Sequence, residues 1–256
     1  MTTMIPPILH QTWETLDLPD HLAAFRGTIR THNPGLDMRL YDAAARRNYI
    51  ETHAPQALAA YDGLPFGVAK ADLFRLVAVI AEGGFYADLD VECLKPIDIF
   101  RKTDRAVFSV EAEVMPRRQR ELGYEQPFQL ANCMFGAPAN HPFLRAMLDE
   151  VVKRLAAAPL TDRSQVEDAT GPRALTRLFY ALKPRDVGVL RQVYWVPPDL
   201  YAGIPWLARR IHFRHHFAGT WKKPAEGSQP LTRKLIERNR LPNPYPAGLW
   251  HDFGWS

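Results

Sequence analysis

Two aspartates, Asp88 and Asp90, are the strongest candidates for chemistry in this sequence. They follow the pair Gly83-Gly84 within residues 85–92, which we expect to be extended, so that both carboxylates face one side. Carboxylates aimed at one point repel each other unless a cation lies between them, and Mg²⁺ or Mn²⁺ takes such oxygen ligands while keeping positions open for phosphates. A lone Asp-x-Asp is usually a solvated strand end, but the residues before this one favour a metal site.

The element that must position these aspartates is an expected amphipathic helix that ends at the two glycines. Apolar residues recur at helical spacing between residues 68 and 80, and Gly-Gly is a C-terminal stop signal. Asp72 and Arg75 are three residues apart, so they project from one side of this helix. Such a pair is ordinarily a surface salt bridge worth at most about 1 kcal/mol. Because Gly-Gly-x-x-x-Asp-x-Asp follows it, we interpret the pair as part of the same site.

The stretches ADLFR (residues 71–75) and GGFYADLD (residues 83–90) together resemble the DxD-type glycosyltransferases with a sugar-binding region. This is glycosyltransferase family 32, which includes the yeast initiating α-1,6-mannosyltransferase, the inositol-phosphoceramide mannosyltransferases and bacterial capsule or lipopolysaccharide sugar transferases. The catalytic domains of large clostridial toxins share the same helix-to-DxD arrangement. The resemblance implies a retaining hexosyltransferase, dependent on Mn²⁺ or Mg²⁺, that moves a sugar from a UDP- or GDP-sugar to a glycan or lipid-linked acceptor in surface polysaccharide synthesis.

The resemblance also divides the four residues between the cation and the sugar. Asp90 is implied to coordinate the metal directly and Asp88 to share a sugar or metal contact, although the sequence does not rank them. Asp72 and Arg75 match helix residues that contact donor-sugar hydroxyls in the toxin relatives, and Arg75 also suits charge on the leaving phosphate. No residue can be named as a covalent nucleophile. A front-face displacement, in which positioning and electrostatics supply most of the catalysis, needs none.

The opening of the chain is similar to the Ile-Pro-x-x-Ile-His-Gln-Thr-Trp pattern of the family, matched here over residues 5–13. Trp13 is the candidate to stack on a nucleobase, and Gln11 is a second donor-site candidate beside it. The alternative for Trp13 is a position in the core.

A late segment, HHFAGTW at residues 215–221, resembles the closing His-x-x-x-Ser-Trp motif of the family, with Thr220 where Ser is commoner. An imidazole suits Mn²⁺ as a further ligand, and the spacing favours His216 over His215. The indole N–H of Trp221 can donate to a phosphate oxygen. The alternative is a pair of surface histidines beside a core tryptophan.

Two positions match residues that line the acceptor side in relatives. They are Asn132 and Gly171, the second of which lies in the turn Thr170-Gly171-Pro172. The resemblance carries these two assignments alone, since neither residue type is diagnostic of acceptor binding.

Short strands alternate with helices in the first half of the chain, which predicts an α/β fold with a mostly parallel, doubly wound sheet. In such sheets ligands bind at the carboxyl ends of strands. We expect strands at 5–10, 36–41, 106–110, 129–136 and 193–196, helices at 19–33, 43–53, 141–158 and from 170–172 to 183–184, and a mobile loop at 111–126. With the resemblance, this implies one GT-A-type (Rossmann-like) domain, with residues 1–100 as the nucleotide-sugar half and 101–256 as the acceptor half and closing segment.

The composition limits the remaining possibilities. A chain of 256 residues, 46% of them apolar, can bury one sizeable core. The net charge of +4 suits an anionic ligand or an acidic membrane surface, and no basic run follows a nucleic-acid-binding motif. Two cysteines, no signal-like N-terminus and no long apolar stretch predict a cytoplasmic protein, or one peripheral at the inner membrane face.

Two alternatives to a transferase stay open from the sequence. One is a carbohydrate- or nucleotide-binding protein that lacks turnover. The other is a phosphohydrolase that uses Asp-x-Asp as nucleophile and acid; it fits less well, because that class needs a small Thr or Val where this chain has Glu92.

Overall fold

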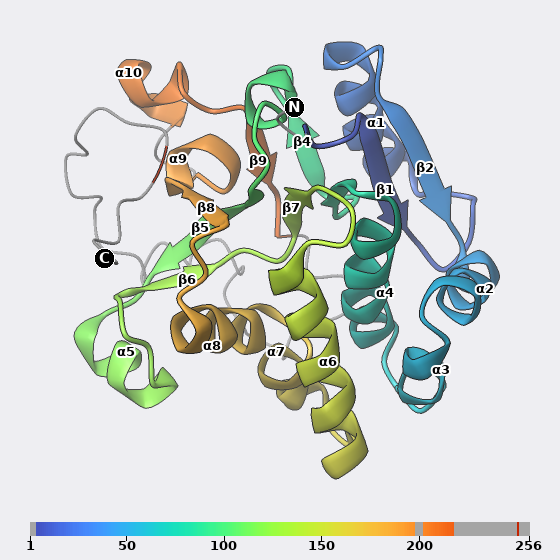
Figure 1. Cartoon of the computed structure of the whole chain (residues 1–256). Coiled ribbons are helices and arrows are strands. Elements are labelled where there is room, and N and C mark those ends of the chain that lie inside the picture. Colours follow the sequence, from blue (N-terminus) through green and yellow to red (C-terminus); the bar gives the residue numbers. More distant parts are fainter. Residues whose placement is uncertain (1–3, 198–201, 218–249, 251–256) are drawn as a thin grey trace, which may run out of the picture.

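The computed structural model describes residues 4–197, 202–217 and 250, and it shows a central sheet with helices on both faces (Figure 1). The first half holds β1 (Ile8–Thr12), α1 (Asp20–His32), β2 (Asp37–Tyr41), α2 (Ala43–His53), α3 (Pro55–Asp62), α4 (Gly67–Glu82), β3 (Gly84–Ala87), β4 (Val91–Cys93) and the short 3₁₀ helix η1 (Asp98–Phe100). The second half holds β5 (Ala106–Glu113), α5 (Pro116–Leu122), β6 (Phe128–Leu130), β7 (Met134–Ala137), α6 (Pro142–Ala157), η2 (Arg163–Gln165), α7 (Val166–Ala169), α8 (Pro172–Leu182), β8 (Val187–Leu190), α9 (Gln192–Trp195), α10 (Pro205–Ala208) and β9 (Phe213–His215).

The sheet has the strand order β2-β1-β3-β7-β5-β6, and β8 also pairs with β5. The pairings of β1 with β2, β1 with β3 and β5 with β8 are parallel, whereas β7 runs antiparallel to both β3 and β5, and β6 antiparallel to β5. It follows that β1, β2, β3, β5 and β8 point the same way and that β6 and β7 point the opposite way. The predicted α/β fold with a mostly parallel sheet is confirmed.

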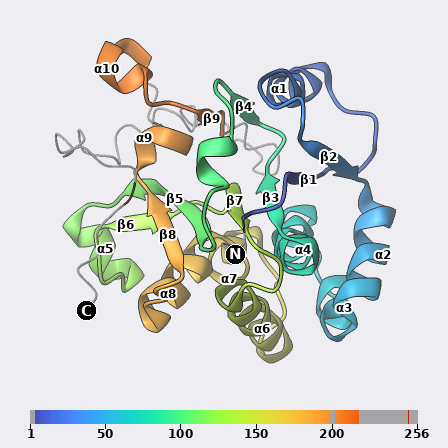
Figure 2. The ribbon, with the colours of Figure 1, turned by 45° about the horizontal axis from the view of Figure 1, so that its top comes forward.

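Apolar side chains from the strands enter two separate cores, one on each face of the sheet. Tyr86 packs in the core that includes α4, α6 and α8, while its neighbour Phe85 packs in the core that includes α9, β4 and β9. This alternation follows from the pleat, since consecutive side chains of a strand point to opposite faces. Figure 2 shows the two layers, with α4 and α6 side by side under the sheet and the small β4–β9 sheet beyond its other face.

Two glycines connect α4 to β3, and each has a positive φ, of 72° at Gly83 and 94° at Gly84. A Cβ on Gly84 would lie 2.5 Å from the backbone oxygen of Ile8, so β3 can approach β1 this closely only without a side chain there. The stop signal read from the sequence therefore also lets the amino-terminal end of β3 pack closely against that of β1.

Away from the two aspartates, three expected elements are wrong. Residues 111–126, expected as a mobile loop, contain the end of β5 and helix α5, and residues 129–136 form two strands, β6 and β7, with a turn between them. Residues 193–196, expected as a strand, fall within and just after α9, whereas the strand is β8. Val193 and Trp195 are buried in a single helical turn, and an apolar run this short does not distinguish a strand from a buried turn.

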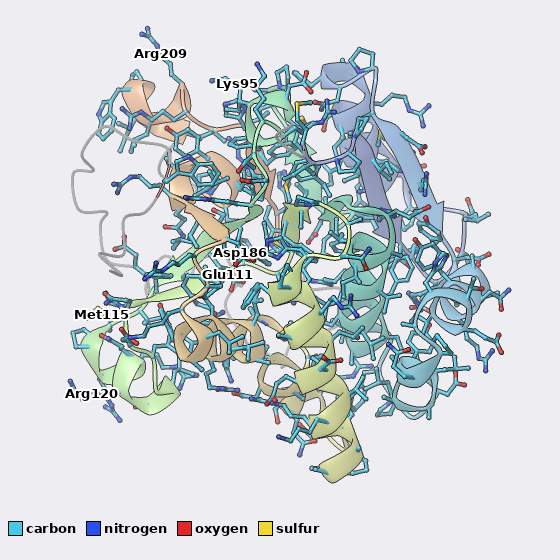
Figure 3. All side chains as sticks on the ribbon, viewed as in Figure 1. Lys95, Glu111, Met115, Arg120, Asp186 and Arg209 are labelled. Atoms are coloured by element: carbon cyan, nitrogen blue, oxygen red, sulfur yellow. The ribbon has the colours of Figure 1, made fainter. Side chains whose placement is uncertain are left out.

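Lys95, which follows β4, contacts the backbone oxygen of Arg209, and this contact ties the segment after α10 to the β4–η1 loop. Figure 3 labels both residues, at the top of the molecule. Of the helices that the structure describes, none has the length and apolarity needed to cross a membrane.

Candidate functional site

A cavity of about 600 Å³ opens at the carboxyl ends of β1 and β3. Its walls come from the end of β1, one side of α4, the turn between β3 and β4, the end of β9 and residues 163–172. Seven of the residues singled out from the sequence line it: Trp13, Asp72, Arg75, Asp88, Asp90, Asn132 and Gly171.

Asp88 and Asp90 lie in a tight turn between β3 and β4. The Asp88 amide donates to the Cys133 oxygen at 2.7 Å, and the Val91 amide donates back to the Asp88 oxygen at 3.2 Å. The expectation that residues 85–92 form one extended run is therefore wrong. It is the turn, and not strand alternation, that brings the two carboxylates to the same side.

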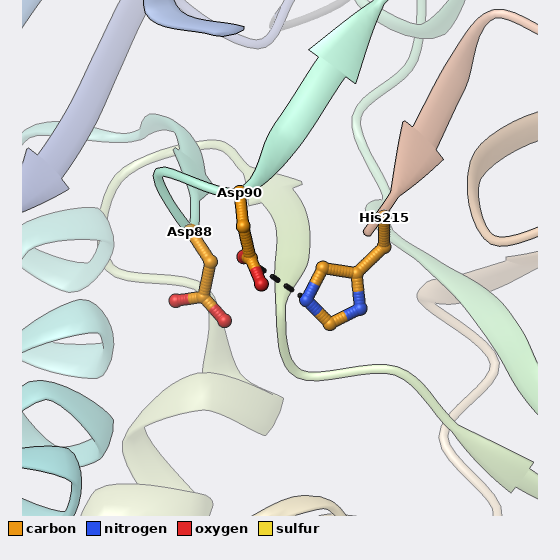
Figure 4. A group of neighbouring side chains, drawn as sticks. All are labelled: Asp88, Asp90 and His215. Atoms are coloured by element: carbon orange, nitrogen blue, oxygen red, sulfur yellow. Dashed lines mark hydrogen bonds and ion pairs between the residues drawn. The ribbon is translucent and has the colours of Figure 1, made fainter. Parts of the chain in front are cut away.

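His215 completes a group of three possible metal ligands with these aspartates. One ligand atom from each of Asp88, Asp90 and His215 lies within 4.8 Å of the others, and Nε2 of His215 is 3.1 Å from Oδ1 of Asp90 (Figure 4). The histidine reaches this position because β9 pairs antiparallel with β4, which sets His215 opposite Val91.

The prediction that His216 is the metal ligand is wrong, because its side chain points to Glu92 and Phe25 and not to the two aspartates. Its Nε2 lies 3.0 Å from a carboxylate oxygen of Glu92, and its ring stacks on Phe25 with centroids 4.2 Å apart. Consecutive residues of an extended segment face opposite ways, so only one of the two histidines can meet the aspartates. The spacing of the two histidines from Trp221 did not reveal which of them meets the aspartates.

The donor set suits a divalent cation. Burial opposes protonation of His215, but Cys133 and the Asp90 carboxylate outweigh it, so the pKa of His215 lies well above its usual 6.5, and a bound cation would displace this proton. Burial has the opposite effect on Asp88, whose pKa it raises, while the positive charge of Arg75 lowers it. Two carboxylates and one imidazole, whose Nε2 faces the aspartates, fit Mn²⁺ and tolerate Mg²⁺.

Arg75 links α4 to the aspartate turn. Its Nη2 lies 3.1 Å from Oδ1 of Asp72 and 3.2 Å from Oδ1 of Asp88, and its Nη1 donates to the Asn132 oxygen at 2.6 Å. The guanidinium carbon stands 4.6 Å from the centroid of the Tyr86 ring. Arg75 and Asp72 are buried, so this is not the surface salt bridge that is usual at this spacing. It fixes a positive charge beside the aspartate turn.

Asp72 is held on both carboxylate oxygens. Asn132 donates to Oδ1 at 3.0 Å, and the Thr170 hydroxyl donates to Oδ2 at 2.8 Å. Burial raises the pKa of Asp72 to about 6, while Arg75 and the hydrogen bonds from Thr170 and Asn132 lower it. The Thr170 contact was not anticipated, although the Thr-Gly-Pro turn had been singled out for Gly171.

Comparison with known proteins identifies the first part of the chain. Residues 10–107 match the family described as "Glycosyltransferase sugar-binding region containing DXD motif". This stretch is a DXD-type sugar-binding region. The resemblance drawn from ADLFR and GGFYADLD is therefore confirmed, and Asp88 and Asp90 are the aspartates of the DXD motif.

Relatives that match longer stretches of the chain are less than 30% identical to it. Inositol phosphoceramide mannosyltransferase 3 of Schizosaccharomyces pombe is 27% identical over 198 residues, which are 77% of this chain and 51% of the relative. The initiation-specific alpha-1,6-mannosyltransferase of Candida albicans is 26% identical over 164 residues, which are 57% of this chain and 42% of the relative. The chain thus spans about half the length of the curated relatives it matches.

Solved structures support the fold. PaToxG glycosyltransferase superposes with a TM-score of 0.54 at 18% identity, covering 80% of this chain and 76% of that one. The galactosyltransferase LgtC in complex with donor and acceptor sugar analogs gives a TM-score of 0.50 at 11% identity, covering 90% and 94%. The expected GT-A-type fold is confirmed.

The donor candidates at the start of the DXD region differ in their placement. Trp13 lies just past the end of β1 and lines the cavity. Gln11 lies within β1, is fully buried, and directs its Nε2 to the Ala87 oxygen at 3.4 Å, so the prediction that it contacts the donor is wrong. Thr220 and Trp221 lie outside the described residues.

Sequence reasoning missed Arg46 and Glu14, two of the charged residues on the cavity wall. Arg46, from α2, is buried, and it reaches Glu14, which follows Trp13, with Nη2 and Oε1 3.1 Å apart. An arginine within a helix carries no local signal of such a contact, because the partner lies 32 residues away.

Proposed function

We propose that this protein is a metal-dependent, retaining hexosyltransferase that transfers a sugar from a UDP- or GDP-sugar to a glycan or lipid-linked acceptor. One observation carries the proposal. Asp88, Asp90 and His215 converge within 4.8 Å at a cavity whose wall also holds the buried pair Asp72 and Arg75. A sugar nucleotide needs its diphosphate neutralised and its sugar oriented, and the two groups meet these needs from adjacent walls.

Asp88, Asp90 and His215 are the residues that would hold Mn²⁺ or Mg²⁺. Such an ion supplies Lewis-acid stabilisation of a diphosphate leaving group. Arg75 adds a fixed positive charge that cannot be lost by deprotonation, 3.2 Å from Asp88. This arrangement favours a departing nucleoside diphosphate over a neutral leaving group.

Asp72 is the candidate for orienting the donor sugar. Its oxygens are fixed by Asn132 and Thr170, and each keeps acceptor capacity for a sugar hydroxyl. Because the carboxylate is already held, little ordering remains to be done when the sugar binds. We assign retention, which the resemblance implies, to a front-face displacement in which the leaving phosphate helps to deprotonate the acceptor hydroxyl, because this route needs no covalent nucleophile from the protein.

The acceptor assignment rests on the relatives, whose names describe mannosyltransferases and include inositol phosphoceramide as acceptor. By analogy we place a lipid-linked or glycan hydroxyl on the side of the cavity formed by Asn132 and Gly171. We further propose that the acceptor is a capsule or lipopolysaccharide precursor. The protein would meet it in the cytoplasm, at an acidic inner membrane face.

The test is a panel of UDP- and GDP-sugars incubated with the full-length protein and Mn²⁺. We expect slow hydrolysis of one donor, lost in Asp90→Asn with an unchanged circular dichroism spectrum. Asp98→Asn, which alters an exposed aspartate paired with Arg101, is the matched control. Binding without hydrolysis or transfer would instead support a binding protein, and hydrolysis of p-nitrophenyl phosphate a phosphohydrolase. If no nucleotide sugar binds in the presence of metal, the proposal is wrong.

A further inference from the structure

Arg46 is an unusual residue to find beneath a cavity, because its guanidinium is buried. It donates from Nε to the Tyr61 hydroxyl at 3.0 Å, from Nη1 to the Thr12 hydroxyl at 3.1 Å and from Nη2 to Glu14 at 3.1 Å. Burying a cation is costly unless it is paired, and of these three partners only Glu14 carries a charge. The guanidinium is therefore a fixed support, and what it fixes is the Glu14 carboxylate.

Glu14 itself is open to the cavity. Its side chain is 60% exposed, although one oxygen, Oε1, is held by Arg46. In the described part of the chain Arg46 is the one polar group seen to contact this carboxylate. Gly67, the first residue of α4, also lies close to this carboxylate. A Cβ on Gly67 would stand 2.8 Å from Oε1. An oriented carboxylate thus stands in a narrow gap beside Trp13.

An aromatic face and an adjacent carboxylate recognise different parts of a nucleobase. The indole of Trp13 suits the π-face, and a carboxylate, which can only accept hydrogen bonds, suits an edge with N–H donors. Guanine presents two neighbouring donors, N1–H and the 2-amino group, which match the two carboxylate oxygens in a charge-assisted pair. Uracil presents a single N3–H between two carbonyl oxygens, and a carboxylate repels both of them.

We infer that Glu14, positioned by Arg46, reads the base edge and selects a guanine nucleotide donor over a uracil one. The inference rests on the proposed function, because it needs a nucleotide sugar in the cavity with its base against Trp13. Arg46 acts through Glu14 and is a positioning residue. Trp13 stacks on the base and does not distinguish guanine from uracil.

The test measures the affinity of the full-length protein for GDP, IDP, UDP and XDP by titration calorimetry with Mn²⁺ present. The wild-type protein should bind GDP most tightly, and IDP, which lacks the 2-amino group, about tenfold more weakly or worse. Glu14→Gln should weaken GDP binding by about tenfold or more and leave UDP within about threefold. It should also improve XDP binding, because the amide can donate to the 2-oxo group that xanthine carries in place of the amine.

Glu51→Gln is the matched control, since Glu51 is an exposed glutamate on α2 that pairs with Arg47 away from the cavity. It should leave all four affinities unchanged. If Glu14→Gln does not fold, the order of GDP, IDP and UDP binding to the wild-type protein still decides the question.

The inference is overturned if the wild-type protein binds UDP as tightly as GDP, or if Glu14→Gln changes stability without changing the GDP-to-UDP ratio. In either case the proposed transferase function stands. If none of the four nucleotides binds, the proposed function itself fails.

Discussion

The pH dependence of folding stability should report directly on Asp72. Its carboxyl is buried beneath the cavity wall, and burial raises its pKa from the usual 3.8 to about 6. The folded protein therefore binds this proton more tightly than the unfolded chain, in which the carboxyl returns to its ordinary pKa. Stability from this group is fully present below about pH 4 and is lost as the pH rises through about 6. A shift of about two units corresponds to about 3 kcal/mol.

The assay is urea unfolding of the wild-type protein and of Asp72→Asn at several pH values between 4 and 7, with EDTA present so that no cation contributes. The amide has nearly the shape of the carboxyl and does not titrate. Other carboxyls, Asp88 among them, are present in both proteins, so their titration largely cancels in the difference. We expect the variant to gain about 2 kcal/mol relative to the wild-type protein between pH 4 and pH 7, since part of the full effect lies below pH 4.

A constant offset between the two proteins is expected as well, because the amide leaves Arg75 with one carboxylate partner fewer. Only the slope with pH tests the reasoning. A difference that stays flat from pH 4 to pH 7 would show that Asp72 is solvated in the folded protein, and that the wall around it is more open than the structure indicates.

Three further predictions concern the backbone, the support of Asp72 and the metal. Gly84→Ala should lower the free energy of unfolding by about 2 kcal/mol or more in urea titrations, because the residue has a positive φ and no room for a Cβ. Thr170→Val should cost about 1–2 kcal/mol in the same assay, and Thr170→Ser much less, because only valine removes the donor to Asp72; equal effects of the two changes would contradict this. His215→Ala should weaken Mn²⁺ binding by about tenfold or more, and His216→Ala should leave it unchanged, as measured by calorimetry.

Local signals predicted the parts of the site that lie close together in the sequence. The helical period that places Asp72 and Arg75, the glycine pair that ends α4 and the aspartates that follow are all contained within about two dozen residues, and each obeys a local rule. Even here the geometry differed, since residues 88–90 form a turn and not an extended strand. The two carboxylates do lie on one side, as expected, but the turn places them there and not the alternation of a strand.

Contacts between distant segments could not be predicted in this way. His215 meets Asp90 across 125 positions, and the choice between it and His216 depends on the register of β9 against β4. The Thr170 hydroxyl meets Asp72 across 98 positions. Registers and long-range contacts are set by the packing of whole elements, and a single sequence carries no period or spacing that encodes them.

Arg46 and Glu14 show a further limit. An arginine in an amphipathic helix is ordinarily solvated, and a glutamate after a strand is ordinarily part of a loop. Their functional interpretation appears only when the buried guanidinium, the exposed carboxylate and Trp13 are seen on one cavity wall.

The central claim is that Asp88, Asp90 and His215 hold a cation at which a nucleotide diphosphate docks. The most direct measurement is a titration of the protein into Mn²⁺, followed by the electron paramagnetic resonance signal of the free ion, with and without a nucleoside diphosphate. The account predicts one bound Mn²⁺ per chain, bound more tightly when the nucleotide is present, and loss of both effects in Asp90→Asn. Mn²⁺ binding that is indifferent to the nucleotide, or unchanged in Asp90→Asn, would contradict it.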